Sequence, residues 1–212
     1  MKFKEAIEEA TTKSKKRKFS QSIELVFNFS KIDFNKPDTR LKMDIVLPKG
    51  RGKARKAAVI AGDELVPEAK ANADLVLTQD DIKALGKDKK RLKKVVDQND
   101  FFICQADLMP LVGKEMGQVL GPKGKMPRPV PPNAKLKLLI ESMKKTVNVA
   151  SKGKFLPTIH AVIGTEEMTP DDLTVNAETI YNAIIEKMPN REGNIRSVFV
   201  KTSMGPSIKV TV

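Results

Sequence analysis

The amino-acid sequence predicts an α+β domain built from both chain ends, with a three-layer, Rossmann-like α/β domain inserted in its middle. Residues 21–29 and 40–47 alternate apolar with polar side chains, as half-buried strands of antiparallel sheets do. Residues 57–61 are apolar throughout, which is typical of a strand buried on both faces. After about residue 146 the alternation returns, so the chain passes from one kind of sheet to another and back.

These two changes of pattern define the expected domains. Residues 1–53 and 146–212 are predicted to form the α+β domain, and residues 54–145 the inserted domain. Because the chain would cross between the domains twice, a hinge motion is expected.

The first part of the chain predicts a helix and a strand pair. Apolar side chains recur at helical spacing over residues 3–14. The strands at 21–29 and 40–47 are joined by a loop that contains Asn35 and Pro37. The two strands are predicted to pair antiparallel and to share a polar face: Glu24, Asn28, Lys42 and Asp44.

The middle part alternates strands with helices. Leu75–Leu77 and Phe101–Cys104 follow the apolar run at 57–61 as further buried strands. Helical spacing lies between them, and residues 108–120 and 133–145 also predict helices. Strands and helices in this succession predict a largely parallel sheet covered by helices.

The last part predicts strands around one long helix. Thr169 suits the N-cap and Pro170 the first helical position, while Asp171 and Asp172 suit the positive end of the helix dipole. An apolar stripe then continues to Met188. Alternating residues predict the accompanying strands: Val147, Val149, Ile159, Ala161, Ile163, Val198, Val200, Ile208 and Val210.

The charge balance indicates a polyanionic partner, either nucleic acid or an anionic membrane surface. The 212 residues include 39 Lys and Arg against 26 Asp and Glu, a formal net charge of +13. Basic clusters lie at residues 13–18, 49–56, 87–94 and 114–128. One such run is usually a solvated helix face, but four of them, two beside Gly or Pro turns, favour nucleic acid.

Other features of the composition exclude several classes of protein. No run of about 18 apolar residues occurs, so no membrane span is predicted, and Met1–Ala6 lacks the apolar core of a signal peptide. The single Cys excludes an internal disulfide and suits a reducing cytoplasm. The expected protein is therefore cytoplasmic, and no membrane is expected among its partners.

Residues for catalysis are scarce. His160 is the only His, so neither a His-based acid–base pair nor a His metal cluster is expected. Cys104 lies in an apolar run, where Cys behaves as a small hydrophobic residue. The segment Gly121–Lys125 lacks the spacing and the final Ser or Thr of a phosphate loop. No catalytic residue, metal or cofactor is predicted.

The turn at residues 202–207 offers groups that suit a sugar–phosphate backbone. The hydroxyls of Thr202 and Ser203 can donate and accept hydrogen bonds, and Met204 can stack on a flat ring. Gly205 permits close approach of a backbone because it has no Cβ. The alternative interpretation is a hairpin turn with a Met in the core.

Four segments stand in an order and spacing that together are distinctive: Lys18–Glu24, Leu47–Gly50, Leu120–Pro127 and Ser203–Ser207. With them the chain resembles the universal ribosomal protein L-one family, the stalk proteins of the large subunit, over essentially its whole length. The Lys-rich character and short C-terminus resemble archaeal members.

The resemblance implies binding to large-subunit ribosomal RNA through the domain that holds both termini. It also implies a mobile stalk beside the exit site for deacylated tRNA, whose release the protein assists, and repression of translation through its own messenger RNA. Off the ribosome a monomer is expected. The implied RNA-binding residues are Lys18, Phe19, Ser22, Glu24, Asn28, His160, Ser197, Thr202, Ser203, Met204 and Gly205.

Two of these residues carry a physical argument of their own. The carboxylate of Glu24 repels phosphates, so it is expected to accept a hydrogen bond from a 2′-hydroxyl or a base amino group. The alternative for Glu24 is an ordinary exposed strand residue. For Phe19, packing in the core is an open alternative to stacking on a base.

Two other functions stay open at this point. One is a free RNA-binding regulator without a ribosomal role. The other is an enzyme that acts on a phosphorylated substrate in the α/β insert, against which the lack of a phosphate loop and of an acid–base pair argues.

Overall fold

Strand pairing separates the chain into two units. A computed structural model describes residues 2–34, 39–132, 134–151 and 156–211. Unit 1 comprises Met1–Lys53 with Lys145–Val212, and unit 2 comprises Ala54–Lys144. An antiparallel sheet from both chain ends and an inserted parallel sheet with helices confirm the predicted fold class.

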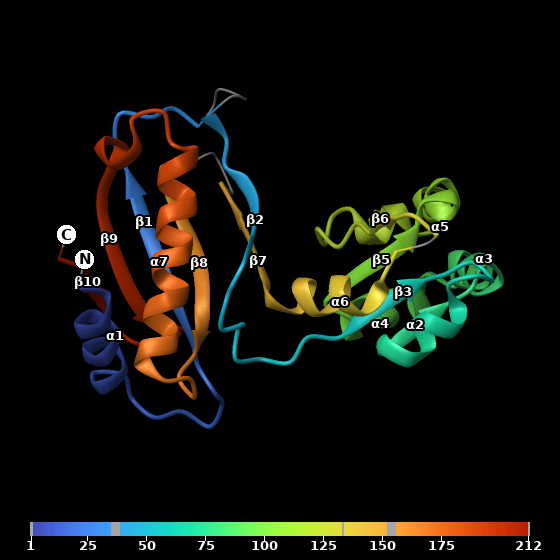
Figure 1. The fold of residues 1–212 in the computed structure, drawn as a ribbon, viewed down its shortest axis with the longest axis horizontal. Coiled ribbons are helices and arrows are strands. Elements are labelled where there is room, and N and C mark those ends of the chain that lie inside the picture. Colours follow the sequence, from blue (N-terminus) through green and yellow to red (C-terminus); the bar gives the residue numbers. More distant parts are fainter. Residues whose placement is uncertain (1, 35–38, 133, 152–155, 212) are drawn as a thin grey trace. The chain divides into compact units, whose positions relative to one another are not determined.

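Unit 1 is built on a four-stranded antiparallel sheet in the order β10-β9-β1-β8 (Figure 1). A strand from the beginning of the chain, β1, thus lies between two strands from its last third. A separate antiparallel pair joins β2 to β7. The elements of this unit are α1 (Phe3–Thr12), β1 (Ser22–Phe29), β2 (Lys42–Val46), β7 (Thr146–Ala150), β8 (Thr158–Thr165), α7 (Pro170–Lys187), η3 (Arg191–Asn194), β9 (Ile195–Thr202) and β10 (Ser207–Lys209).

Helices α1 and α7 cover one face of this sheet (Figure 1). The period-two alternation of β1 directs Leu25 and Phe27 at the helices, where both are fully buried. Tyr181 of α7 packs edge-on against Phe3 of α1 and stacks on Phe27, with ring centroids 5.8 and 6.3 Å apart. Burial of each large side chain contributes about 1.5–3 kcal/mol, so the alternation decides which face becomes the core.

The predicted pairing of the strand at 21–29 with the strand at 40–47 is wrong. Both edges of β1 are occupied by β8 and β9, which also have eight residues and the same alternation. The five-residue β2 instead aligns Ile45 with Val147 of β7, and both side chains are buried. Neighbours in sequence usually pair, but matching of strand length and apolar register prevails here.

Unit 2 has a four-stranded parallel sheet in the order β4-β3-β5-β6. Alternate residues of β3 and β5 point to two separate apolar clusters, one shared with α3, α4 and α5 and the other with α2 and α6. The elements are β3 (Ala57–Ile60), α2 (Val66–Asn72), β4 (Leu75–Leu77), α3 (Gln79–Lys87), α4 (Lys89–Gln98), β5 (Phe101–Gln105), η2 (Ala106–Leu108), α5 (Met109–Leu120), β6 (Arg128–Val130) and α6 (Leu136–Lys145). The result is the predicted three-layer α/β arrangement.

Local signals mark two helix starts, of which the one at Thr169 was predicted. The Thr169 hydroxyl accepts a hydrogen bond from the Asp172 amide, with Pro170 in the first turn of α7. Thr78 and Asp81 form a capping box at α3. No sequence pattern predicts β6, because its three residues include Pro129 and are too few to show alternation.

Candidate nucleic-acid interface

The sheet of unit 1 has a second face that points away from α1 and α7, here called the open face. Asn28 stands between Thr158 of β8 and Ser197 of β9. The Asn28 amide donates to Ser197 Oγ at 3.1 Å and accepts from Thr158 Oγ1 at 3.1 Å. Four residues earlier in β1, Glu24 lies opposite Lys201. The register therefore brings the predicted Glu24, Asn28 and Ser197 onto one surface.

A row of two apolar side chains and His160 crosses the open face between these polar positions. Val26 of β1 stands between His160 of β8 and Phe199 of β9. His160 is exposed, while Val26 and Phe199 are half-buried. Val26 and Phe199 are absent from the predicted site, although their positions in the alternation, two residues from Glu24 and from Ser197, place them on its face.

The turn after β9 lies beside the start of β1. The Ser203 amide donates to the Ser22 carbonyl at 3.0 Å, and the Ser22 amide donates to Ser203 Oγ at 3.2 Å. Phe19 is 52% exposed and Met204 61% exposed. Core packing, the alternative interpretation for both side chains, is therefore wrong, and both are available to a partner.

Thr202 and Gly205 face the interior of the same turn. Thr202 is fully buried, and its hydroxyl lies 2.9 Å from the hydroxyl of Ser14. A Cβ added to Gly205 would lie 2.3 Å from Thr202 Oγ1. Direct contact of these two residues with RNA stays a prediction, and the Thr202 side chain has no exposed surface to offer.

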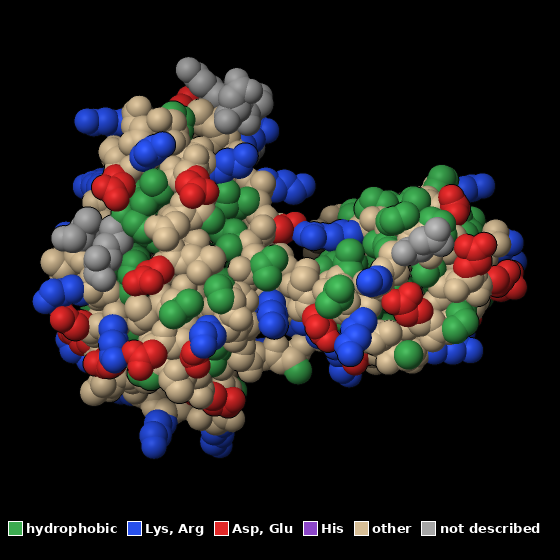
Figure 2. All heavy atoms as spheres, viewed as in Figure 1, with side chains coloured by type: hydrophobic (Ala, Val, Ile, Leu, Met, Phe, Trp, Pro, Cys, Tyr) green, Lys and Arg blue, Asp and Glu red, His purple; other side chains and the backbone are tan. Residues whose placement is uncertain are grey.

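Basic side chains without an ion-pair partner among the described residues lie between α1 and β1. Lys15, Lys16, Arg17 and Lys18 are exposed, and no described residue forms an ion pair with them. Figure 2 shows Lys and Arg side chains projecting at the lower edge of unit 1, where this connection turns in Figure 1. Among the described residues Glu24 also has no hydrogen bond or ion pair, so its carboxylate is available as an acceptor.

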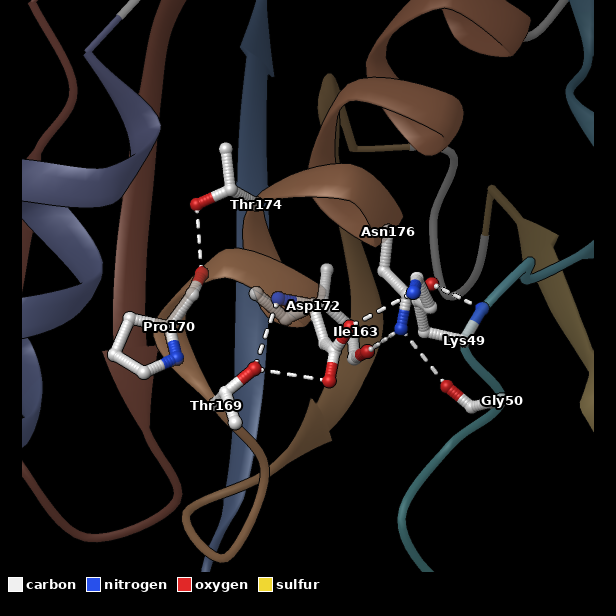
Figure 3. A network of polar contacts seen from close by, with 8 residues as sticks. All are labelled: Lys49, Gly50, Ile163, Thr169, Pro170, Asp172, Thr174 and Asn176. Atoms are coloured by element: carbon white, nitrogen blue, oxygen red, sulfur yellow. Dashed lines mark hydrogen bonds and ion pairs between the residues drawn. The ribbon is translucent and has the colours of Figure 1, made fainter.

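The segment Leu47–Gly50 is held by α7 (Figure 3). The buried amide of Asn176 donates to the carbonyls of Gly50 and Ile163, each at 2.8 Å, and accepts from the Lys49 amide at 3.1 Å. One side chain thus fixes the point at which the chain leaves unit 1.

The ammonium of Lys49 is paired as well. Its Nζ lies 3.1 Å from Asp172 Oδ1, and the Thr169 hydroxyl donates to the other carboxylate oxygen at 2.9 Å. The Thr169 hydrogen bond, followed by the Lys49 contact, lowers the pKa of Asp172. The segment Leu47–Gly50, one of the four that carry the resemblance to the family, therefore makes contacts that stabilise the fold.

In unit 2, the lysines of the segment Gly121–Lys125 are committed to α4. Lys123 pairs with Asp97, and Lys125 Nζ donates to the carbonyls of Val96 and Asn99 at 2.8 and 2.7 Å, at the C-terminal end of that helix. The segment thus docks on a helix end, and its lysines are not directed at a phosphate.

Other reactive groups show no arrangement for catalysis. Burial raises the pKa of the Cys104 thiol to about 12, which keeps it protonated at neutral pH. Among the residues that the structure describes, no three His, Cys, Asp or Glu side chains gather in a way that could hold a metal ion. In the same part of the chain, every helix is too short or too polar to cross a membrane.

Comparison with known proteins gives consistent matches. The model of the "Ribosomal protein L1p/L10e family" matches residues 11–206. A protein of Methanothermococcus thermolithotrophicus named "Large ribosomal subunit protein uL1" is 44% identical over 205 residues, which cover 97% of this chain and 95% of the relative. Proteins of the same name from Methanocaldococcus jannaschii (42% identity, 97% and 93% covered) and Methanothermobacter thermautotrophicus (43%, 97% and 97%) are similar along the same length.

Proposed function

Because the chain belongs to the ribosomal protein L1p/L10e family, we propose that it binds large-subunit ribosomal RNA through unit 1. The observation that carries this proposal is the meeting of Ser22, Ser203 and Met204 beside the free basic run Lys15–Lys18. Family membership also answers the enzyme alternative, since the family is one of structural proteins of the ribosome.

Two kinds of contact act together in this proposal. The basic run attracts phosphates without regard to sequence, which supplies affinity that falls as salt rises. The open face and the turn supply discrimination, because hydroxyls, an exposed Met and a carboxylate can read 2′-hydroxyls and unstacked bases. The carboxylate of Glu24 repels phosphates and accepts hydrogen bonds from 2′-hydroxyls or base amino groups. It therefore favours an RNA that places such a donor beside it and disfavours others.

The finer roles extend the same surface. We propose that the bound protein forms the mobile stalk beside the exit site for deacylated tRNA and assists tRNA release. We also propose that it represses translation by binding its own messenger RNA with the surface that binds ribosomal RNA. One shared surface makes the two RNAs competitors, so repression would begin when ribosomal RNA is saturated.

The central experiment compares binding of the full chain to large-subunit and small-subunit ribosomal RNA across a salt series. Met204→Ala should weaken binding to large-subunit RNA by about 1–2 kcal/mol, as for a lost stacking contact. Met126→Ala is the matched control, because Met126 is 50% exposed in unit 2. Equal effects of the two variants, or equal affinity of the wild type for both RNAs, would contradict the proposal.

Glu24→Gln gives a sharper second test. Removing the charge should strengthen binding to small-subunit RNA, because a repulsion of phosphates is lost. The same change should weaken binding to large-subunit RNA, because a strong acceptor is lost. An increase for both RNAs would mean that Glu24 only repels and reads nothing.

The repression is tested by translating the protein's own messenger RNA in vitro with added protein. Output should fall as protein is added and recover when large-subunit ribosomal RNA is supplied. Failure of the ribosomal RNA to relieve repression would separate the two activities and refute the shared surface.

A further inference from the structure

Gln21 is a buried polar residue at the centre of the proposed interface, and the proposed function does not use it. It directly precedes β1, and its side chain is fully buried. The amide nitrogen Nε2 lies 3.0 Å from Ser14 Oγ, 3.2 Å from the Lys15 carbonyl and 3.3 Å from Glu166 Oε2. The amide oxygen accepts from the Met204 backbone N–H at 3.2 Å. Every polar atom of this buried amide therefore has a partner.

These partners belong to three segments that are far apart in the chain. Ser14 and Lys15 begin the basic run, Met204 lies in the turn after β9, and Glu166 follows β8. The backbone of Gln21 is held too, since its N–H donates to Glu166 Oε1 and its carbonyl accepts from the Glu166 N–H, both at 3.0 Å. One residue thus joins the source of positive charge to the turn that carries Met204.

The contacts also close a ring. Ser14 Oγ bonds to Gln21 and to the Thr202 hydroxyl, while Met204, two residues after Thr202, bonds back to Gln21. A closed ring of hydrogen bonds restrains the turn more than one contact could, because the turn is held at two residues, Thr202 by Ser14 and Met204 by Gln21.

We propose that Gln21 is a positioning residue for RNA discrimination, an inference that rests on the proposed function. Gln21 contacts no RNA itself, since it has no exposed surface. It fixes where Met204 and Ser203 stand relative to the basic run before RNA arrives, which lowers the ordering cost of the specific contacts. Attraction between lysines and phosphates depends on charge and distance and needs no such precision. Loss of Gln21 should therefore lower discrimination and leave non-specific binding intact.

The test replaces Gln21 with Met, which keeps an unbranched side chain of similar length and removes the hydrogen bonds. Asn194→Leu is the matched control. Asn194 is another buried amide of unit 1, and it bonds to Ser30 and Asn190 beyond the opposite end of β1. For both full-length variants, one measures dissociation constants for large-subunit and small-subunit ribosomal RNA, the melting temperature, and hydrogen exchange at the Met204 amide.

The expected result separates positioning from general stability. Gln21→Met should reduce the ratio of affinities for the two RNAs about tenfold, with small-subunit RNA affected by less than about twofold. The Met204 amide should exchange faster in this variant only. Asn194→Leu should lower the melting temperature by a similar amount and leave the ratio unchanged.

Each other result overturns the inference or the function beneath it. An unchanged ratio in Gln21→Met, or equal loss in both variants, would make Gln21 merely structural. A wild type that does not discriminate between the RNAs would refute the proposed function instead. If Gln21→Met does not fold, Ser14→Ala opens the same ring at its partly exposed hydroxyl, and an unchanged ratio there would also refute the inference.

Discussion

Replacing Gly205 with Ala should destabilise unit 1 through a contact within its own turn. The added Cβ would lie 2.3 Å from Thr202 Oγ1 and 3.3 Å from Ser14 Oγ. Thr202 must then rotate or shift, which breaks its 2.9 Å hydrogen bond to Ser14. Overpacking costs about 1–3 kcal/mol and the lost hydrogen bond about 1 kcal/mol. Ala regains about 0.5 kcal/mol by restricting the unfolded chain, so the expected net loss is about 2 kcal/mol.

A double-mutant cycle isolates the clash. Thr202→Ala removes the hydroxyl that the new Cβ meets, so Gly205→Ala should cost close to nothing in that background. The coupling energy should be about 2 kcal/mol, well above the error of about 0.5 kcal/mol for independent sites. Gly193→Ala in η3 is the control within unit 1, because its added Cβ would meet only Asn190 Cβ at 3.7 Å, an ordinary van der Waals contact.

The chain itself supplies the assay. It contains no Trp and a single Tyr, and Tyr181 is buried in the core of unit 1 between Phe3 and Phe27. Tyrosine fluorescence during urea titration therefore reports the unfolding of unit 1 alone. If Gly205→Ala lowers the unfolding free energy equally in the wild type and in the Thr202→Ala background, the reasoning is refuted. The glycine would then be required for a reason other than its contact with the Thr202 hydroxyl.

Three further outcomes are expected. Lys125→Met should destabilise unit 2 by about 1–2 kcal/mol in urea titrations followed by circular dichroism, because two carbonyls at the end of α4 lose their donor. Lys123→Met removes only an exposed ion pair and should cost less than about 0.5 kcal/mol. Similar costs for the two variants would contradict the helix-capping role of Lys125. Because the pKa of Asp172 is lowered from its ordinary 3.8, the ionised Asp172 stabilises the folded state at neutral pH, and this stabilisation is lost on acidification. The difference in unfolding free energy between wild type and Asp172→Asn should therefore shrink from about pH 6 to about pH 2. A difference independent of pH would exclude the charge of Asp172 as its cause. Changing Lys16 to Gln should reduce the slope of log affinity for RNA against log salt by about 0.7–0.9, and an unchanged slope would show that Lys16 contacts no phosphate.

The fold was predictable from the sequence where a pattern is local. The apolar run at residues 57–61 gave a strand buried on both faces, and Thr169 marked the start of α7. Partner choice was not predictable, because β1 and β2 have the same alternation and only the distant β8 and β9 show which strand fits. The three residues of β6 carry no pattern at all.

The candidate site divides in the same way. Phe199 could have been found, since it shares the alternation of Ser197. Gln21 was not found. It shares the alternation of Ile23 in the predicted strand at 21–29, but a Gln side chain is usually exposed, and its burial depends on Glu166 and Met204, which are 145 and 183 residues away. Buried polar residues of this kind are recognised only when their partners are in place.

The position of β1 between β8 and β9 orders events during synthesis of the chain. When Phe29 has been made, β1 has neither neighbour, and the second arrives only with Thr202. At about 5–20 residues per second that interval lasts roughly 9–35 s. Unit 2 pairs strands that are close in sequence and can close meanwhile. An unfinished chain thus exposes an apolar strand and lacks the turn that carries Met204, so under the proposed function only the completed protein would discriminate between RNAs.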